Sequence, residues 1–192
     1  MEKYNIVLLG DAGVGKTALA IRFVQGQFAE DYDATIFDKF PLTFVVDGKT
    51  VDIQIHDTAG QGDYSSFLPG WIRHGHAFML VYDLTDRESF QKLKSTYIPT
   101  IQSVLENLSI PVVLIGNKYD LMTEGNTNRH RQVSVEDAQD LSQSLNCTCI
   151  EASAKTRYNL SVCFETAVRQ ARKFYPPQEM NTEATTKFCS VL

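Results

Sequence analysis

Residues 10–17 form a glycine-rich segment in which a lysine is followed by a hydroxyl side chain: Gly-Asp-Ala-Gly-Val-Gly-Lys-Thr. The apolar run 6–9 comes directly before it, so a buried strand would lead into this turn and a helix would follow. In that setting backbone N–H groups and the positive end of a helix dipole converge on an anion. Lys16 would reach the β- and γ-phosphates, and the Thr17 hydroxyl would ligate Mg²⁺. The segment therefore predicts a site for a nucleoside triphosphate.

A second segment, residues 57–61, reads Asp-Thr-Ala-Gly-Gln and follows a run of alternating apolar residues. A carboxylate at the end of a strand, here Asp57, can hold the metal, usually through water. Gly60 would let a backbone N–H approach the γ-phosphate, and Gln61 could orient an attacking water. Thr35 lies in the loop before the next strand, where its hydroxyl could complete the coordination of Mg²⁺. These residues predict the metal and water half of a nucleotide site.

Two further segments bear on the base of the nucleotide. Residues 117–120 read Asn-Lys-Tyr-Asp after an apolar strand. The Asp120 carboxylate can accept two N–H bonds from N1 and N2 of guanine, whereas adenine has no such pair of donors. Asn117 can bond the base edge or tie neighbouring loops together, and Lys118 can lay its aliphatic stem along the base. In Ser-Ala-Lys at 153–155, a backbone N–H could donate to guanine O6. Together these segments favour guanine.

Strands and helices alternate along the chain. Residues 6–9, 77–82 and 112–115 are continuous apolar runs, as strands buried on both faces require. Residues 50–56 alternate like a half-covered strand, and Pro41 places the alternating run around it at a sheet edge. The sequence predicts a doubly wound α/β fold, with a mostly parallel six-stranded sheet, one antiparallel edge strand and helices on both faces. Ligands of such sheets bind beyond the carboxyl ends of the strands.

The predicted helices have recognisable faces and ends. Apolar residues at helical spacing run through 160–171 and, less regularly, through 90–104, where Pro99 predicts a kink. Ser134 and Asp137 have the spacing of a capping box at the start of another helix. Residues 123–133 are predicted to be a polar loop. Around Gly70 the combination of glycine and proline predicts a loop-like or broken segment.

Composition limits the class of protein. The chain has 192 residues, 43% hydrophobic and 21% charged, which suits one globular domain. A net charge of −5 without a basic stripe argues against nucleic acid as a partner. We expect neither a signal peptide nor a membrane-spanning segment, and we expect the four cysteines to be reduced thiols. These features favour a cytoplasmic location.

Taken together and in this order, the segments resemble those of a Ras superfamily small GTPase over about residues 3–175. The first switch segment, Tyr-Asp-Ala-Thr-Ile at 32–36, together with Gln61 and the C-terminal tail, makes the chain most similar to the Ras branch, although parts of the first switch resemble the Rho branch. The resemblance implies a P-loop NTPase fold, with a GTPase domain over 1–175. Residues 176–192 would be a disordered hypervariable tail.

The resemblance also implies a cycle between a GTP form that binds effectors and a GDP form that does not. Turnover in such proteins is slow, so exchange factors and GTPase-activating proteins are expected partners. The catalytic residues would be Gln61, Lys16 and Thr35, and the metal would be held by Thr17, Thr35 and, indirectly, Asp57. The nucleotide-binding set would consist of Ala12, Gly13, Val14, Gly15, Lys16, Thr17, Ala18, Phe28, Tyr32, Thr35, Gly60, Asn117, Lys118, Asp120, Ser153, Ala154 and Lys155.

The chain departs from the Ras branch at two places that matter for partners. Ala12 stands where a glycine is usual, and its methyl group would occupy space that an incoming arginine finger and Gln61 need. Phe37 replaces the usual acid, and Pro41 removes a backbone donor from the edge where effectors often add a strand. We expect weaker activator-stimulated hydrolysis and an altered choice of effectors.

The last four residues, Cys-Ser-Val-Leu, predict prenylation at Cys189 by a prenyltransferase. Leu as the final residue favours a geranylgeranyl over a farnesyl group. Lys187 is the one basic residue of the tail, so we expect reversible residence at the cytoplasmic face of a membrane, and we expect this to be the plasma membrane.

Two alternatives remain open at this point. A P-loop ATPase or kinase would share residues 10–17 but not the guanine-selective segments. A nucleotide-binding scaffold that hydrolyses hardly at all is suggested by Ala12 and opposed by Gln61.

Overall fold

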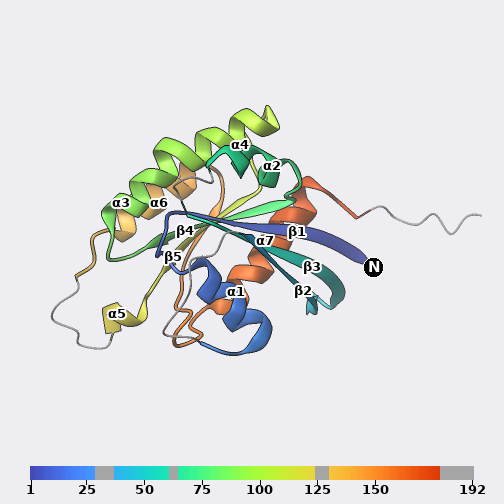
Figure 1. Ribbon diagram of the computed structural model, residues 1–192, viewed down its shortest axis with the longest axis horizontal. Coiled ribbons are helices and arrows are strands. Elements are labelled where there is room, and N and C mark those ends of the chain that lie inside the picture. The colour runs from blue at the N-terminus through green and yellow to red at the C-terminus, as the bar shows by residue number, and fades with distance from the viewer. Residues whose placement is uncertain (29–36, 61–64, 124–129, 178–192) are drawn as a thin grey trace, which may run out of the picture.

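The computed structural model describes residues 1–28, 37–60, 65–123 and 130–177. A central sheet has the strand order β2-β3-β1-β4-β5-β6, with helices on both sides (Figure 1). Its strands are β1 (Glu2–Leu9), β2 (Phe37–Val46), β3 (Lys49–Thr58), β4 (Ala77–Asp83), β5 (Val112–Asn117) and β6 (Thr148–Glu151).

The sheet has the predicted direction pattern. Strand β1 pairs in parallel with β3 and β4, and β5 pairs in parallel with β4 and β6. Strand β2 lies at the edge and pairs antiparallel with β3, with Pro41 opposite Gln54 in an uninterrupted ladder. The edge position leaves one side of β2 without a partner strand, which is where a residue lacking an N–H is tolerated. The predicted mostly parallel sheet with one antiparallel edge strand is confirmed.

The helical segments of the described residues are α1 (Lys16–Gln25), η1 (Ser65–Phe67), α2 (Leu68–Arg73), α3 (Arg87–Lys92), η2 (Leu93–Tyr97), α4 (Ile98–Leu105), α5 (Asp120–Thr123), α6 (Val135–Ser144) and α7 (Leu160–Phe174). Helices α1 and α7 cover one face of the sheet, and α2, α3, α4 and α6 cover the other (Figure 1).

Strand β1 supplies both hydrophobic cores because alternate side chains point to opposite faces. Ile6 and Leu8 pack in the core beneath α1 and α7, whereas Val7 and Leu9 pack in the core beneath α2, α3 and α4. All four are fully buried. A strand covered on both faces must be apolar throughout, which is why the run 6–9 shows no alternation.

The long helical stretch after β4 is irregular just before Pro99, the residue at which the sequence predicts a kink. A π-helical turn, η2, lies between α3 and α4, and the Ile98 N–H donates to the Leu93 carbonyl across it. Pro99 follows in the first turn of α4, where it has no N–H to donate to the preceding turn, and the wider π-helical turn lies just before it. The predicted cap is also present, since the Ser134 hydroxyl accepts from the Asp137 N–H at the start of α6.

The expectation of a loop around Gly70 is only partly right. Residues 65–73 form a 3₁₀ turn followed by the short helix α2, so the segment is broken but its second part is helical. Leu68 and Ile72 of α2 are buried against the sheet. Burying two such side chains contributes about 3–6 kcal/mol, which exceeds the roughly 1 kcal/mol cost of a helical glycine, and Pro69 lies in the first turn.

Candidate functional site

The predicted site residues gather at one rim of the sheet because five strands run in the same direction. Strands β1, β3, β4, β5 and β6 all end there, at the rim opposite the N-terminus (Figure 1). The loops after β1, β3, β5 and β6 carry the segments that the sequence singled out. The rim is therefore the place where phosphate, metal and base contacts can be combined.

The phosphate-binding loop is held tightly. Gly15 has a φ of 92° and immediately precedes α1; a side chain there would meet the Asn117 amide, with a Cβ only 2.4 Å from Nδ2. The Lys16 side chain lies along the loop, and its Nζ donates to the carbonyl oxygens of Gly10 (2.9 Å) and Asp11 (2.8 Å). Burial lowers the pKa of Lys16 to about 8, although the nearby Asp57 and Asp11 carboxylates oppose the shift. A buried cation thus lies where phosphates are predicted.

Two oxygens suited to a magnesium ion meet beside this lysine. The Thr17 hydroxyl at the start of α1 donates to Oδ2 of Asp57 at the end of β3, and both side chains are buried. Hydroxyl and carboxylate oxygens are the ligands that Mg²⁺ accepts. Among the described residues no three His, Cys, Asp or Glu side chains gather to hold a metal. The pair fits a cation that takes its other ligands from phosphates and water.

Gly60 lies back to back with the phosphate-binding loop. A Cβ built on Gly60 would fall 2.2 Å from the Ala12 nitrogen and 2.7 Å from the Asp11 carbonyl carbon. Such separations are far inside van der Waals contact, so only glycine fits there. The loop after β3 and the loop after β1 are therefore in direct contact at their backbones.

The segments predicted to bind the base are connected to each other and to the phosphate-binding loop through Asn117. Its Nδ2 donates to the Val14 carbonyl (2.8 Å), and its Oδ1 accepts from the Ala154 N–H (3.3 Å). The sequence left two roles open for Asn117, a bond to the base edge or a link between loops. In the structure its amide links the loops. Beside it, the Ser153 hydroxyl donates to Oδ1 of Asp120 (2.5 Å), and both of these side chains are buried.

Three other predicted residues are described at this rim or near it. The Lys118 ammonium pairs with Oδ2 of Asp83 at the end of β4 (2.8 Å). Lys155 is exposed, and its carbonyl accepts from Arg22 of α1 (3.4 Å). Phe28 lies shortly after the end of α1. It is an apolar aromatic residue, yet 36% of its surface is exposed to solvent.

The remaining members of the nucleotide-binding set lie in or next to the loop. Ala12 and Gly13 are exposed, Val14 is buried and Ala18 is half-buried in the first turn of α1. The predictions for Tyr32, Thr35, Gln61 and Cys189 lie outside the described residues.

Sequence reasoning missed three side chains at this rim. Asp83 carries a signal that could have been used, a carboxylate at the carboxyl end of a buried strand. Tyr97 donates to the Gly10 carbonyl (2.9 Å), and Lys92 pairs with the Asp11 carboxylate (2.6 Å). Lys92 lies in α3 and Tyr97 in η2, both far along the chain from the phosphate-binding loop, and no local sequence pattern predicts their contacts with it.

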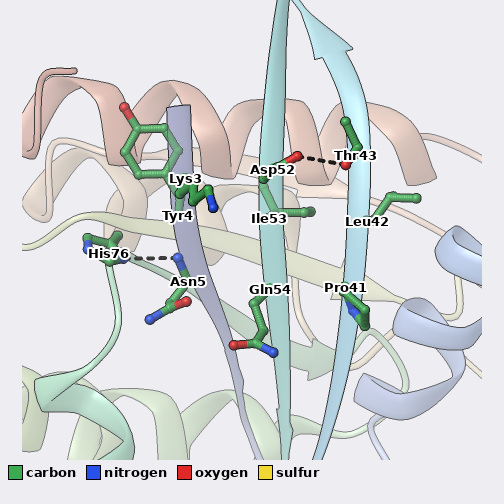
Figure 2. A pocket seen from close by; sticks show the side chains of 10 residues that line it. All are labelled: Lys3, Tyr4, Asn5, Pro41, Leu42, Thr43, Asp52, Ile53, Gln54 and His76. Carbon is green, nitrogen blue, oxygen red and sulfur yellow. Dashed lines mark hydrogen bonds between the residues drawn. The ribbon is translucent and has the colours of Figure 1, made fainter. Parts of the chain in front are cut away.

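A hollow of about 350 Å³ lies elsewhere, on the sheet face formed by β1, β3 and β2. Figure 2 shows Lys3, Pro41 and Gln54 around it, with the backbone N–H of Asn5 bonded to Nδ1 of His76 (2.9 Å). None of the predicted nucleotide-binding residues lines it. It is therefore not the predicted nucleotide site.

Comparison with known proteins agrees with the geometry. A model of the Ras family matches residues 5–173. The chain is similar to Ras-like protein 1 of Saccharomyces cerevisiae, with 42% identity over 172 residues, which is 90% of this chain and 53% of that protein. The chain thus spans about half the length of this curated relative.

Within residues 1–28, 37–60, 65–123 and 130–177, no helix is both long and apolar enough to cross a bilayer.

Proposed function

We propose that this chain, which belongs to the Ras family, is a molecular switch that binds GTP and GDP with Mg²⁺ and hydrolyses GTP slowly. The observation that carries the proposal is the bridge made by Asn117. One amide side chain joins the phosphate-binding loop at Val14 to the loop that carries Ala154. A phosphate site and a base site built as one unit suit a nucleotide better than a phosphate-containing metabolite.

Each side chain has a distinct part in this proposal. Lys16 would exchange its two backbone carbonyl partners for phosphate oxygens, and a buried cation gains most from such a charge-assisted bond. Thr17 and Asp57 would hold the magnesium ion, which offsets charge on the phosphates during transfer to water. Asp120, held by Ser153, would accept the two N–H groups of guanine. Gln61 would orient the attacking water.

The switch would depend on the outermost phosphate. Thr35 and Gly60 would contact the γ-phosphate and its metal and would relax once that group is released. The direct contact between Gly60 and Ala12 supports a switch of this kind, because the loop after β3 lies directly against the loop in which the γ-phosphate would bind. Exchange factors, GTPase-activating proteins and effectors are the proposed partners.

We propose that the edge strand β2 binds effectors differently from the same strand of ordinary Ras-branch proteins. Phe37, Lys39 and Pro41 alternate along β2, and Phe37 stacks on Trp71 of α2 with ring centroids 5.7 Å apart. An acid and a backbone donor of ordinary Ras-branch proteins are missing here. We expect the GTP-loaded protein to bind a typical Ras-binding domain more weakly than an ordinary Ras does, which isothermal titration would measure. Equal affinities would contradict this.

The division into a GTPase domain over 1–175 and a tail over 176–192 stays a prediction, as does a geranylgeranyl group on Cys189. Membrane fractionation of the full chain beside its Cys189→Ser variant would check the lipid. Release of the variant, but not the parent, into the soluble fraction is expected.

The experiment that tests the proposal is nucleotide exchange on the purified protein. GTP and GDP should compete for the site with the same fluorescent guanine nucleotide, and ATP should not compete. Competition by ATP would favour the P-loop ATPase or kinase alternative. Timed phosphate release, compared with Gln61→Leu, separates a slow GTPase from a scaffold: equal rates in the two proteins would favour the scaffold.

A further inference from the structure

An acidic side chain lies inside the phosphate-binding loop. Asp11 comes between Gly10 and Ala12, and its side chain is only 14% exposed. Its own carbonyl oxygen accepts from Nζ of Lys16 at 2.8 Å, so the residue adjoins the atom predicted to contact the phosphates. A carboxylate in this position repels a polyphosphate.

The field of the carboxylate reaches the groups around it. Burial is the larger effect at both neighbours: it lowers the pKa of Lys16 and raises the pKa of Tyr97, whose hydroxyl donates to the Gly10 carbonyl. The Asp11 charge raises the pKa of both groups. Because these groups surround the loop, a nucleotide bound there would lie within the same field. An isolated negative charge at Asp11 would therefore weaken binding.

Lys92 supplies the compensating charge from helix α3. Its ammonium lies 2.6 Å from Oδ2 of Asp11 and 3.2 Å from the more exposed Glu88 carboxylate one turn earlier. The bond to Asp11 is the first cause of the raised pKa of Lys92, ahead of the bond to Glu88. Lys92 is half-buried and ends α3 just before the π-helical turn, whose Tyr97 holds Gly10. The loop is thus held at two adjacent residues by one stretch of α3 and η2.

We propose that Lys92 is a positioning residue for the nucleotide, acting through Asp11: its ammonium neutralises the carboxylate in the loop and so permits tight binding of a polyphosphate. The inference rests on the proposed guanine-nucleotide site and adds a residue to it. Because GTP carries one more negative charge than GDP, loss of Lys92 weakens GTP binding more than GDP binding. Helix α3 thereby contributes to the balance between the two nucleotide forms.

An ion pair that only fastened α3 to the loop would behave differently. Removing either partner would then have the same effect, because the same bond is lost. Neutralisation predicts opposite signs. Lys92→Met leaves an unpaired carboxylate beside the phosphates, whereas Asp11→Asn leaves an ammonium that is paired only with the exposed Glu88 carboxylate and attracts them.

The test measures dissociation constants of GDP and of a non-hydrolysable GTP analogue for the full chain and its variants at low salt. We expect Lys92→Met to weaken GDP binding by about three- to ten-fold, with a larger loss for the GTP analogue. Asp11→Asn should tighten both, and Asp11→Asn combined with Lys92→Met should return close to the parent. The loss in Lys92→Met should shrink as salt is raised.

Two further variants serve as controls. Lys94→Met removes the same charge from the exposed surface of η2 and should leave affinity unchanged. Lys92→Arg keeps the charge and should restore most of the affinity. Equal weakening by Asp11→Asn and Lys92→Met, or an effect of Lys94→Met equal to that of Lys92→Met, would overturn the inference. A parent protein that binds no guanine nucleotide would instead overturn the proposed function.

Discussion

The backbone of Gly60 rests against the backbone of Ala12, so closely that a methyl group on Gly60 would lie 2.2 Å from the Ala12 nitrogen. Gly60 follows strand β3, and Ala12 belongs to the loop after β1. Adjacent parallel strands bring the two loops to the same rim, where Leu8 of β1 is already paired with Asp57 of β3. If one loop is displaced, the other must therefore move with it.

Gly60→Ala should push the two loops apart. Forcing a methyl group into a filled space costs about 1–3 kcal/mol, so we expect a lower free energy of unfolding and weaker nucleotide binding. Denaturant unfolding and nucleotide titration measure the two effects. Gly70→Ala is the matched control, because a Cβ on Gly70 in helix α2 would have no atom within 4 Å apart from its chain neighbours and the backbone of its own helix. The control should be neutral or stabilising by up to about 1 kcal/mol; similar losses in both variants would contradict the account.

Ser153→Ala should weaken guanine binding. The Ser153 hydroxyl donates to the Asp120 carboxylate at 2.5 Å and holds it in a buried position. Losing a hydrogen bond to a charged group costs about 1.5–3 kcal/mol, so affinity for GDP should fall by roughly ten-fold or more. Ser142→Ala, a buried serine of α6 that bonds only locally to Gln139, is the control for the substitution itself. An unchanged GDP affinity in Ser153→Ala would show that the carboxylate needs no such support.

Nucleotide affinity should fall as the pH rises above about 8. Burial lowers the pKa of Lys16 to about 8 in the free protein. Phosphate oxygens beside the ammonium raise this pKa, so binding takes up a proton whenever the free lysine is neutral. The dissociation constant should then increase by up to about ten-fold per pH unit. Titrations between pH 7 and pH 9.5 measure this slope.

Guanine itself titrates at alkaline pH, so the Lys16 contribution needs its own control. In Lys16→Arg the side chain stays charged throughout this range, and any remaining slope belongs to the base. The parent should have the steeper slope even if the arginine variant binds less tightly. Parallel slopes would assign the whole effect to the base.

Ala12→Gly should accelerate activator-stimulated hydrolysis. The Ala12 side chain is exposed on the phosphate-binding loop, in the space where an activator's arginine and Gln61 are predicted to meet. Single-turnover rates with a matched activating protein, measured with the same amount of bound GTP, would test this. Equal rates in the parent and the glycine variant would show that the Ala12 methyl group does not hinder the activator.

Much of the fold could be predicted because burial leaves a direct mark on the sequence. The apolar runs at 6–9, 77–82 and 112–115 became β1, β4 and β5, and Pro41 correctly placed β2 at the edge. The positions of the motif segments also followed, since parallel strands must end at one rim. Short motifs at strand ends are local features, and local features can be read from a single chain.

The contacts between those segments could not be predicted in the same way. Asn117 had two possible roles, and only the structure shows that it bridges Val14 and Ala154. The pair formed by Asp11 and Lys92 joins residues 81 positions apart, and no spacing rule connects a loop to a half-buried side chain of a later helix. Helix α2 formed against its own propensity because tertiary burial outweighed it. Long-range partners and marginal helices depend on the assembled fold.

All the roles proposed above depend on a guanine nucleotide at the rim of the sheet. The decisive measurement is extraction of the purified full chain under mild conditions, with chromatographic identification of the released nucleotide. We expect GDP or GTP at close to one molecule per chain, lost when magnesium is chelated. Protein that carries an adenine nucleotide, or that neither retains nor takes up a guanine nucleotide, would contradict the proposed function.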